Sequence, residues 1–172
     1  MTKKIIVVLL LATAVFAQGK KAGRVSPHDK TTVTLGGKEI TIEYGRPYLK
    51  GRSVGNEVAP YGQVWRTGAN EATKLTTPVN LKIGTLAVPA GSYSLYTLPT
   101  EKVWKLIVNK TADQWGTEYN QGTDFGRVDL KLAKAAASVE QLTISLDKAG
   151  EKKTTLKIAW GTTLVSVPVV VQ

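Results

Sequence analysis

The sequence has no cysteine and a single histidine, His28. Without cysteine, the chain forms no disulfide bonds and carries no lipid on an N-terminal cysteine. Zinc and related metals are bound mostly through Cys and His, and no acidic cluster has the spacing of a calcium loop. We therefore expect no bound metal and no other cofactor. Nucleophilic catalysis usually needs a histidine base beside the nucleophile, so a Ser-His-Asp or Cys-His enzyme is excluded as well.

Long apolar runs are missing after the first residues. Lys3 and Lys4 precede an apolar stretch from Ile5 to Phe16, and Ala17 follows it. This order is typical of a signal peptide over residues 1–17, cleaved near Ala17. The stretch is shorter than the roughly 20 residues that a membrane-spanning helix needs. We expect an exported protein, periplasmic or secreted, with no transmembrane segment in the mature chain.

Negative charge is scarce: the chain has 23 basic and 13 acidic residues, a net charge of +10. Without Lys3 and Lys4 the net charge is still +8. The basic residues are scattered, whereas a nucleic-acid-binding protein usually concentrates them in a dense stripe. We expect no nucleic-acid partner. A solvated basic surface suits contact with an anionic cell envelope.

Helical periodicity is also missing, and short alternating segments take its place. Apolar residues recur at every second position in Ile40–Tyr44, Val79–Ile83, Leu142–Leu146 and Leu156–Trp160, which is the pattern of half-buried strands. The predicted fold is all-β, an antiparallel β-sandwich or jelly-roll-like domain with little helix. It occupies residues 31–172 as a single domain, after a flexible leader at residues 18–30.

Several local expectations follow from the same patterns. Gly36-Gly37 predicts a hairpin turn. Val103–Val108 is almost wholly apolar, which predicts a central strand with both faces covered, and Trp104 and Trp160 are expected in the core. Val128, Leu130 and Leu132 are expected to point inward. Lys131–Ala137 is rich in alanine and lysine and predicts a turn or two of helix, although it lacks a clear N-cap.

Two segments, Tyr44–Thr76 and Asn109–Gly126, show mostly neither the alternation of a strand nor the 3.6-residue period of a helix. Loops of this length are usually functional or disordered, and the aromatic residues in both segments argue for order. They are therefore the best place to look for a binding site. The candidate ligand-binding residues are Tyr61, Trp65, Arg66, Asn70, Glu71, Trp115, Asp124 and Arg127; no catalytic residue is assigned.

Each candidate type has two interpretations. The loop aromatics could stack on a ligand, or they could close the open end of a sandwich. The acids, among them Glu71 and Asp124, could serve in acid–base catalysis, or they could pair with Arg46, Arg66 or Arg127 to hold the loops. We favour the structural interpretation for the acids and for each aromatic taken alone. Arg66, Asn70 and Glu71 beside Trp65 remain the strongest polar candidates.

The run PYGQVWRTGANEAT at residues 60–73 resembles the signature of an exported bacterial family known as domain of unknown function 2911. Further segments agree with this resemblance: Gly51-Arg52, Pro89–Tyr96, Trp104–Lys110, Gln114–Gly116, and Asp124 with Arg127. The resemblance covers nearly the whole mature chain. It implies an exported single-domain protein and implies no activity.

These observations favour an exported, non-catalytic binding or structural module of the cell envelope, whose partner is an unknown small molecule or an envelope glycan. The alternative is a carboxylate-dependent hydrolase acting on envelope glycans. That reaction needs two carboxyl groups facing one cleft, roughly 5–10 Å apart. A third interpretation is that the signature run is purely architectural.

Overall fold

The computed structural model describes residues 25–172, and they fold as antiparallel β-sheet with one short 3-10 turn, η1 (Gln121–Thr123). The strands are β1 (His28–Leu35), β2 (Lys38–Gly45), β3 (Thr73–Thr77), β4 (Leu81–Ile83), β5 (Leu86–Val88), β6 (Gly91–Leu98), β7 (Trp104–Asn109), β8 (Asp124–Lys148) and β9 (Lys153–Val171). The predicted all-β class is confirmed. The signal peptide and most of the expected leader lie outside the described residues.

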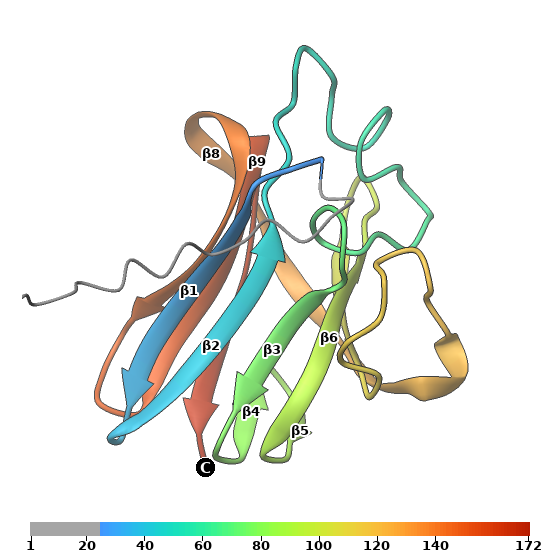
Figure 1. Ribbon diagram of the computed structural model, residues 1–172. Coiled ribbons are helices and arrows are strands. Elements are labelled where there is room, and N and C mark those ends of the chain that lie inside the picture. The colour runs from blue at the N-terminus through green and yellow to red at the C-terminus, as the bar shows by residue number, and fades with distance from the viewer. Residues whose placement is uncertain (1–24) are drawn as a thin grey trace, which may run out of the picture.

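The nine strands form one sheet in the order β1-β2-β3-β6-β7-β8-β9-β4-β5. The first layer contains β1, β2, β3, β6, β7 and the start of β8, and the second contains the later part of β8 with β9, β4 and β5. β8 joins the two layers, because its first residues pair with β7 and its later residues pair with β9. The sheet thereby folds over on itself, and the layers share one core to which strands of both contribute (Figure 1). The hydroxyl of Tyr44 on β2 links them directly, accepting from Ile144 N at 3.0 Å.

The predicted hairpin and central strand are confirmed. Leu35 pairs with Lys38 across the Gly36-Gly37 turn. β7 lies between β6 and β8, and Trp104 and Leu106 are buried in the main core while Ile107 is buried on the opposite face. Trp160 is in the core as well. β1 begins at His28, so the last three residues of the expected leader belong to the first strand.

The helical expectation for residues 131–137 is wrong, and so is the inward orientation of Leu132. These residues lie in β8, where the pairing with β9 shifts between Lys134 and Val139, and Leu132 is exposed. The reason is tertiary: beyond Leu130 the strand leaves β7 and crosses to the second layer. Helix propensity is a weak preference that such pairing overrides.

Two loops carry the irregular segments. The first loop, residues 46–72, connects β2 to β3; the second loop, residues 110–123, connects β7 to η1 and β8. In Figure 1 the first loop rises above the sheet in teal, and the second extends beside β6 in gold. Both loops leave the same two-layered scaffold, and the candidate residues are distributed over them.

Candidate functional site

The first loop is tied to both layers of the sheet. Arg46 donates to Leu142 O at 2.9 Å and pairs with Asp29 of β1 at 2.9 Å. Backbone hydrogen bonds join Leu49 N to Glu140 O and Leu142 N to Pro47 O. The loop therefore begins by crossing from β2 to β8, and this crossing holds its first residues over one end of the sandwich.

Backbone strain is concentrated in the first loop. Within residues 25–172, four residues other than glycine have positive φ: Lys50 (51°), Ala59 (47°), Thr67 (57°) and Asn70 (66°). All four lie in this loop. Such conformations cost about 1–3 kcal/mol each and gather at ligand sites and active sites. Thr67 is notable because it is β-branched and fully buried, a combination that rarely tolerates positive φ.

Trp65 is built into the core. Its backbone forms two hydrogen bonds with Thr97 of β6, both 2.8 Å. Its ring stacks on that of Trp160, with centroids 5.5 Å apart and planes 11° apart, and meets Trp104 edge-on at 6.3 Å. Trp65 remains half-buried, because part of it borders a cavity. Trp65 therefore packs in the core and lines a cavity with the same side chain.

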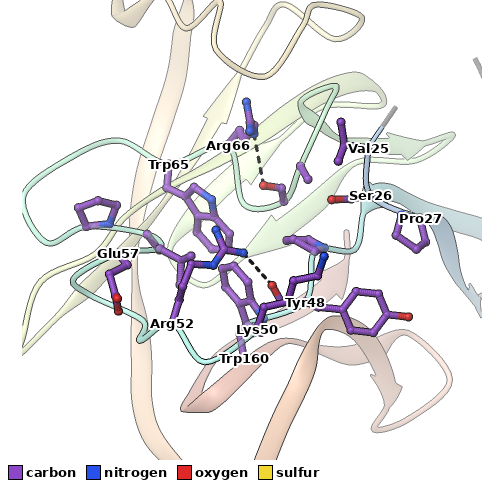
Figure 2. Close-up of a pocket in the computed structure, with 16 residues that line it drawn as sticks. Val25, Ser26, Pro27, Tyr48, Lys50, Arg52, Glu57, Trp65, Arg66 and Trp160 are labelled. Atoms are coloured by element: carbon purple, nitrogen blue, oxygen red, sulfur yellow. Dashed lines mark hydrogen bonds between the residues drawn. The ribbon is translucent and has the colours of Figure 1, made fainter. Parts of the chain in front are cut away.

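That cavity, of about 680 Å³, is the main cavity of the site. It lies between residues 25–27, the first loop and the stacked indoles of Trp65 and Trp160 (Figure 2). Three of its lining residues are basic (Lys50, Arg52 and Arg66) and one is acidic (Glu57). Its composition therefore combines a net positive charge with an aromatic surface.

The charged groups of the main cavity differ in how they are engaged. Arg52 donates to Leu49 O at 2.9 Å. It also donates to Tyr48 O at 2.8 Å (Figure 2). Glu57 accepts from the backbone N–H and the hydroxyl of Ser53, and these hydrogen bonds lower the pKa of its carboxyl. In the described part of the chain, the Lys50 ammonium has no hydrogen-bond or ion-pair partner.

Of the three arginines expected to pair with acids of the irregular segments, Arg127 does so, and Arg46 pairs instead with an acid of β1. Arg46 pairs with Asp29, and Arg127 pairs with Asp124 at 2.8 Å. Arg66 is different: among residues 25–172 no carboxylate lies within ion-pair distance of it. Its Nε donates to Gly68 O at 3.3 Å, and burial lowers the pKa of the guanidinium. Arginine nevertheless stays protonated in proteins.

Asn70 holds the N-terminal end of the described chain. Its side chain accepts from Val25 N at 3.3 Å and donates to Ser26 O at 3.1 Å, and the residue is 5% exposed. Its carbonyl oxygen accepts from Gly116 N of the second loop at 3.0 Å. The amide thus joins residues 25–26 to the first loop, and the backbone at Asn70 joins the two loops.

The other candidates are spread around this centre. The backbone of Glu71 forms an isolated antiparallel β-bridge with Trp115, and Trp115 is 39% exposed. Glu71 also lines a small cavity of about 120 Å³ with Glu43 and Asp113. Tyr61 is 42% exposed, and its ring lies against Gly55, where a Cβ would have no room. Neither Tyr61 nor Trp115 is among the residues that line the main cavity.

Asp124 and Arg127 fasten the second loop. The Asp124 carboxylate accepts from Arg127 at 2.8 Å, from the Tyr119 hydroxyl at 2.8 Å and from Asn109 at 3.0 Å. Burial, followed by the hydrogen bond to Asp124, raises the pKa of Tyr119 to about 12. The cavity lined by Glu71 does not include Asp124.

Sequence reasoning missed Lys50, Glu57 and the lining role of Trp160. The strained conformation of Lys50 has no signature in the sequence, and Trp160 belongs to a regular strand pattern that indicates only burial. Within the described residues, no group of three or more His, Asp and Glu side chains could hold a metal ion. In the same part of the chain, no helix is long and apolar enough to cross a membrane.

The fold and the cavity together define a two-layered antiparallel β-protein with a basic, tryptophan-lined cavity at one end of the sandwich. The chain belongs to the family described as "Protein of unknown function (DUF2911)", whose match covers residues 26–169. The comparisons with curated proteins and with solved structures gave no significant match.

Proposed function

We propose that this protein is a non-catalytic binding module for a small anionic ligand with a flat or apolar part, held in the main cavity. The observation that carries this proposal is the cavity itself: an opening of about 680 Å³ with three basic residues and one acidic residue above a stacked pair of tryptophans. Binding sites combine apolar and aromatic walls with a few placed polar groups in this way.

The charge arrangement supports an anionic ligand. Glu57 is occupied by Ser53, and Arg52 is oriented by two backbone carbonyls, so the guanidinium is held in place before a ligand arrives. The ammonium of Lys50 has no partner of its own in the described chain and can turn to an incoming anion. Charge-assisted hydrogen bonds from such groups are roughly twice as strong as neutral ones.

The strained backbone supports a ligand as well. Lys50 and Ala59, two of the residues with positive φ, line the main cavity. A fold that needed only a loop here could relieve this strain with glycine. Strain kept at a cavity wall is consistent with selection for the position of side chains over stability.

We further propose that the protein is exported to the periplasm or secreted, and that its ligand is an acidic molecule of the envelope, acidic sugars included. The signal-peptide pattern over residues 1–17 and the net positive charge support this localisation. The pair Glu71 and Asp124 gives the hydrolase alternative no support, because Asp124 is engaged by Arg127, Tyr119 and Asn109 and is not among the residues that line the cavity of Glu71.

The test is a thermal-shift titration with glucuronate, N-acetylmuramate and 4-hydroxyphenylacetate, with uncharged glucose as the neutral probe. Binding to the native state raises the melting temperature. We expect at least one anionic probe to raise it, and Lys50→Gln to weaken that binding about tenfold through loss of a charged hydrogen bond. Lys82→Gln, at the exposed middle position of β4, is the matched control and should bind as the wild type does.

Two results would count against the proposed function. One is the absence of any shift with the anionic probes at millimolar concentration. The other is equal weakening by Lys50→Gln and Lys82→Gln, since that would mean that the probes respond to net charge and not to the main cavity.

A further inference from the structure

A second cavity, of about 310 Å³, lies on the outer face of the first layer, and we name it the outer cavity. Trp65 pairs with Thr97 of β6 and turns its ring into the core, so its neighbours Val64 and Arg66 face outward. Tyr96 is next to Thr97 and packs on this outer side with Ala72 and Ile107. The lining residues of the outer cavity are Val64, Trp65, Arg66, Tyr96, Gly116, Thr117 and Tyr119.

Arg66 is the charged residue of the outer cavity. It is half-buried, it has no ion-pair partner in the described chain, and its one hydrogen bond runs from Nε to Gly68 O. Its two Nη groups, with four N–H donors, have no protein acceptor among residues 25–172. In Figure 2 the Arg66 side chain lies at the edge of the main cavity, beyond Trp65 and away from Lys50 and Arg52. Keeping a cation partly out of water without a partner costs free energy. A ligand anion that pairs with Arg66 would offset this cost.

The second loop holds the stem of Arg66 in position. Gly116 donates its N–H to Asn70 O at 3.0 Å, and a Cβ at position 116 would collide with Cδ of Arg66. Only glycine lets the two loops approach this closely. The aliphatic part of Arg66 is therefore clamped, while its guanidinium remains available. A donor fixed in place before binding loses less conformational entropy when a ligand arrives.

The remaining walls suit an apolar group beside an anion. The ring centroids of Tyr96 and Tyr119 lie 4.8 Å apart at the cavity wall, and Val64 adds an aliphatic surface. The Tyr96 hydroxyl accepts from Gln114 at 3.1 Å, which fixes the orientation of its ring. Burial raises the pKa of Tyr96 above its ordinary value. The residues that line the outer cavity include no carboxylate.

We propose that the outer cavity, which borders the main cavity at Trp65 and Arg66, is a second binding site in which Arg66 binds an oxyanion carried on a small apolar or aromatic group. The planar fork of arginine matches a carboxylate or a phosphate with two parallel hydrogen bonds. The rings of Tyr96 and Tyr119 contact the apolar part. This site stands on Arg66 and Gly116, whereas the proposed function of the main cavity is tested at Lys50, so the two proposals can fail separately.

The test is an NMR titration of the 15N-labelled protein with benzoate and with phenyl phosphate, using benzyl alcohol as the neutral analogue. We expect shifts of the Gly116 and Thr117 amide signals with at least one anion, and much weaker effects with the alcohol. The tighter of the two anions identifies the group as carboxylate or phosphate. Arg66→Gln should weaken this binding about tenfold or more.

Two further variants keep the test decisive. Lys50→Gln alters the main cavity alone and should leave benzoate and phenyl phosphate affinity unchanged. Arg66→Lys retains the charge without the planar fork, so it should bind at intermediate strength, and it replaces Arg66→Gln if that variant does not fold. The proposal is overturned if neither anion shifts Gly116 and Thr117, if benzyl alcohol binds equally well, or if the Arg66 variants bind like the wild type.

Discussion

At the residue scale, arginines that look alike in the sequence do different things. Arg46 and Arg66 lie in the same loop. Arg46 pairs with Asp29 and donates to Leu142 O. Arg66 donates only from Nε, and its Nη groups have no acceptor within the described chain. Sequence spacing cannot separate the two cases, because the partner of Arg46 comes from β1 and β8, far along the chain. An arginine without an acidic partner can be recognised only from the three-dimensional structure, which shows where the acidic side chains lie.

Asn70 gives the first prediction at this scale. Its buried amide holds Val25 and Ser26, and its φ of 66° is one that asparagine tolerates better than alanine. Asn70→Ala should therefore lower the free energy of unfolding by about 2–4 kcal/mol, through two lost hydrogen bonds and added backbone strain. Urea denaturation followed by tryptophan fluorescence measures this loss.

Asn70→Gly is the matched control, since glycine accepts the same φ without strain. It should lose the hydrogen bonds but not the backbone term, and so be less destabilised than Asn70→Ala. If Asn70→Ala changed stability by less than about 0.5 kcal/mol, within the range of ordinary surface substitutions, the role of Asn70 in holding the N-terminal segment would be wrong.

At the element scale, strands bounded by clear alternation were predictable and the crossing of β8 was not. The pattern of Ile40–Tyr44 indicates one buried face, and the structure has it in β2. The run at residues 131–137 predicts a short helix because alanine and lysine favour helices, and nothing in this local sequence indicates pairing with β9. β8 carries two pairings in succession, and a local pattern cannot show where a strand changes partner.

Trp104 provides the prediction at the element scale. It begins β7, is 2% exposed, and meets Trp65 edge-on at the base of the first loop. Trp104→Ala should cost about 3–5 kcal/mol, the usual effect of emptying a large aromatic core position. Because Trp65 loses its contact, the substitution should also weaken ligand binding in the main cavity. Denaturant unfolding and the thermal-shift titration measure the two effects.

The neighbouring residue supplies the control for this prediction. Val103 is 40% exposed and precedes the strand, so Val103→Ala should change stability by about 0.5 kcal/mol or less. Similar melting curves for Trp104→Ala and the wild type would show that the tryptophan cluster does not support the fold in the way described.

At the scale of the whole molecule, the fold brings together what the sequence separates. The loops at residues 46–72 and 110–123 were recognisable as irregular and aromatic, which located the candidate region. How they meet depends on the close approach of Gly116 to Arg66 and Asn70. A single sequence does not reveal such a contact, since it depends on how β6 and β7 place the two loops. The larger part of the fold was therefore predictable, and the assembly of the site was not.

The last prediction concerns where the whole molecule works. Lys3, Lys4 and the apolar stretch up to Phe16 predict that the chain is exported and cleaved after Ala17. Mass spectrometry of the protein from its native host should find a mature N-terminus at Gln18 or within a residue or two. Replacing Leu9 and Leu10 by arginine interrupts the apolar stretch and should block this cleavage. Recovery of the uncleaved wild-type chain from the cytoplasm would contradict export, and it would remove the reason for seeking the ligand among envelope molecules, while leaving both cavities open to cytoplasmic anions.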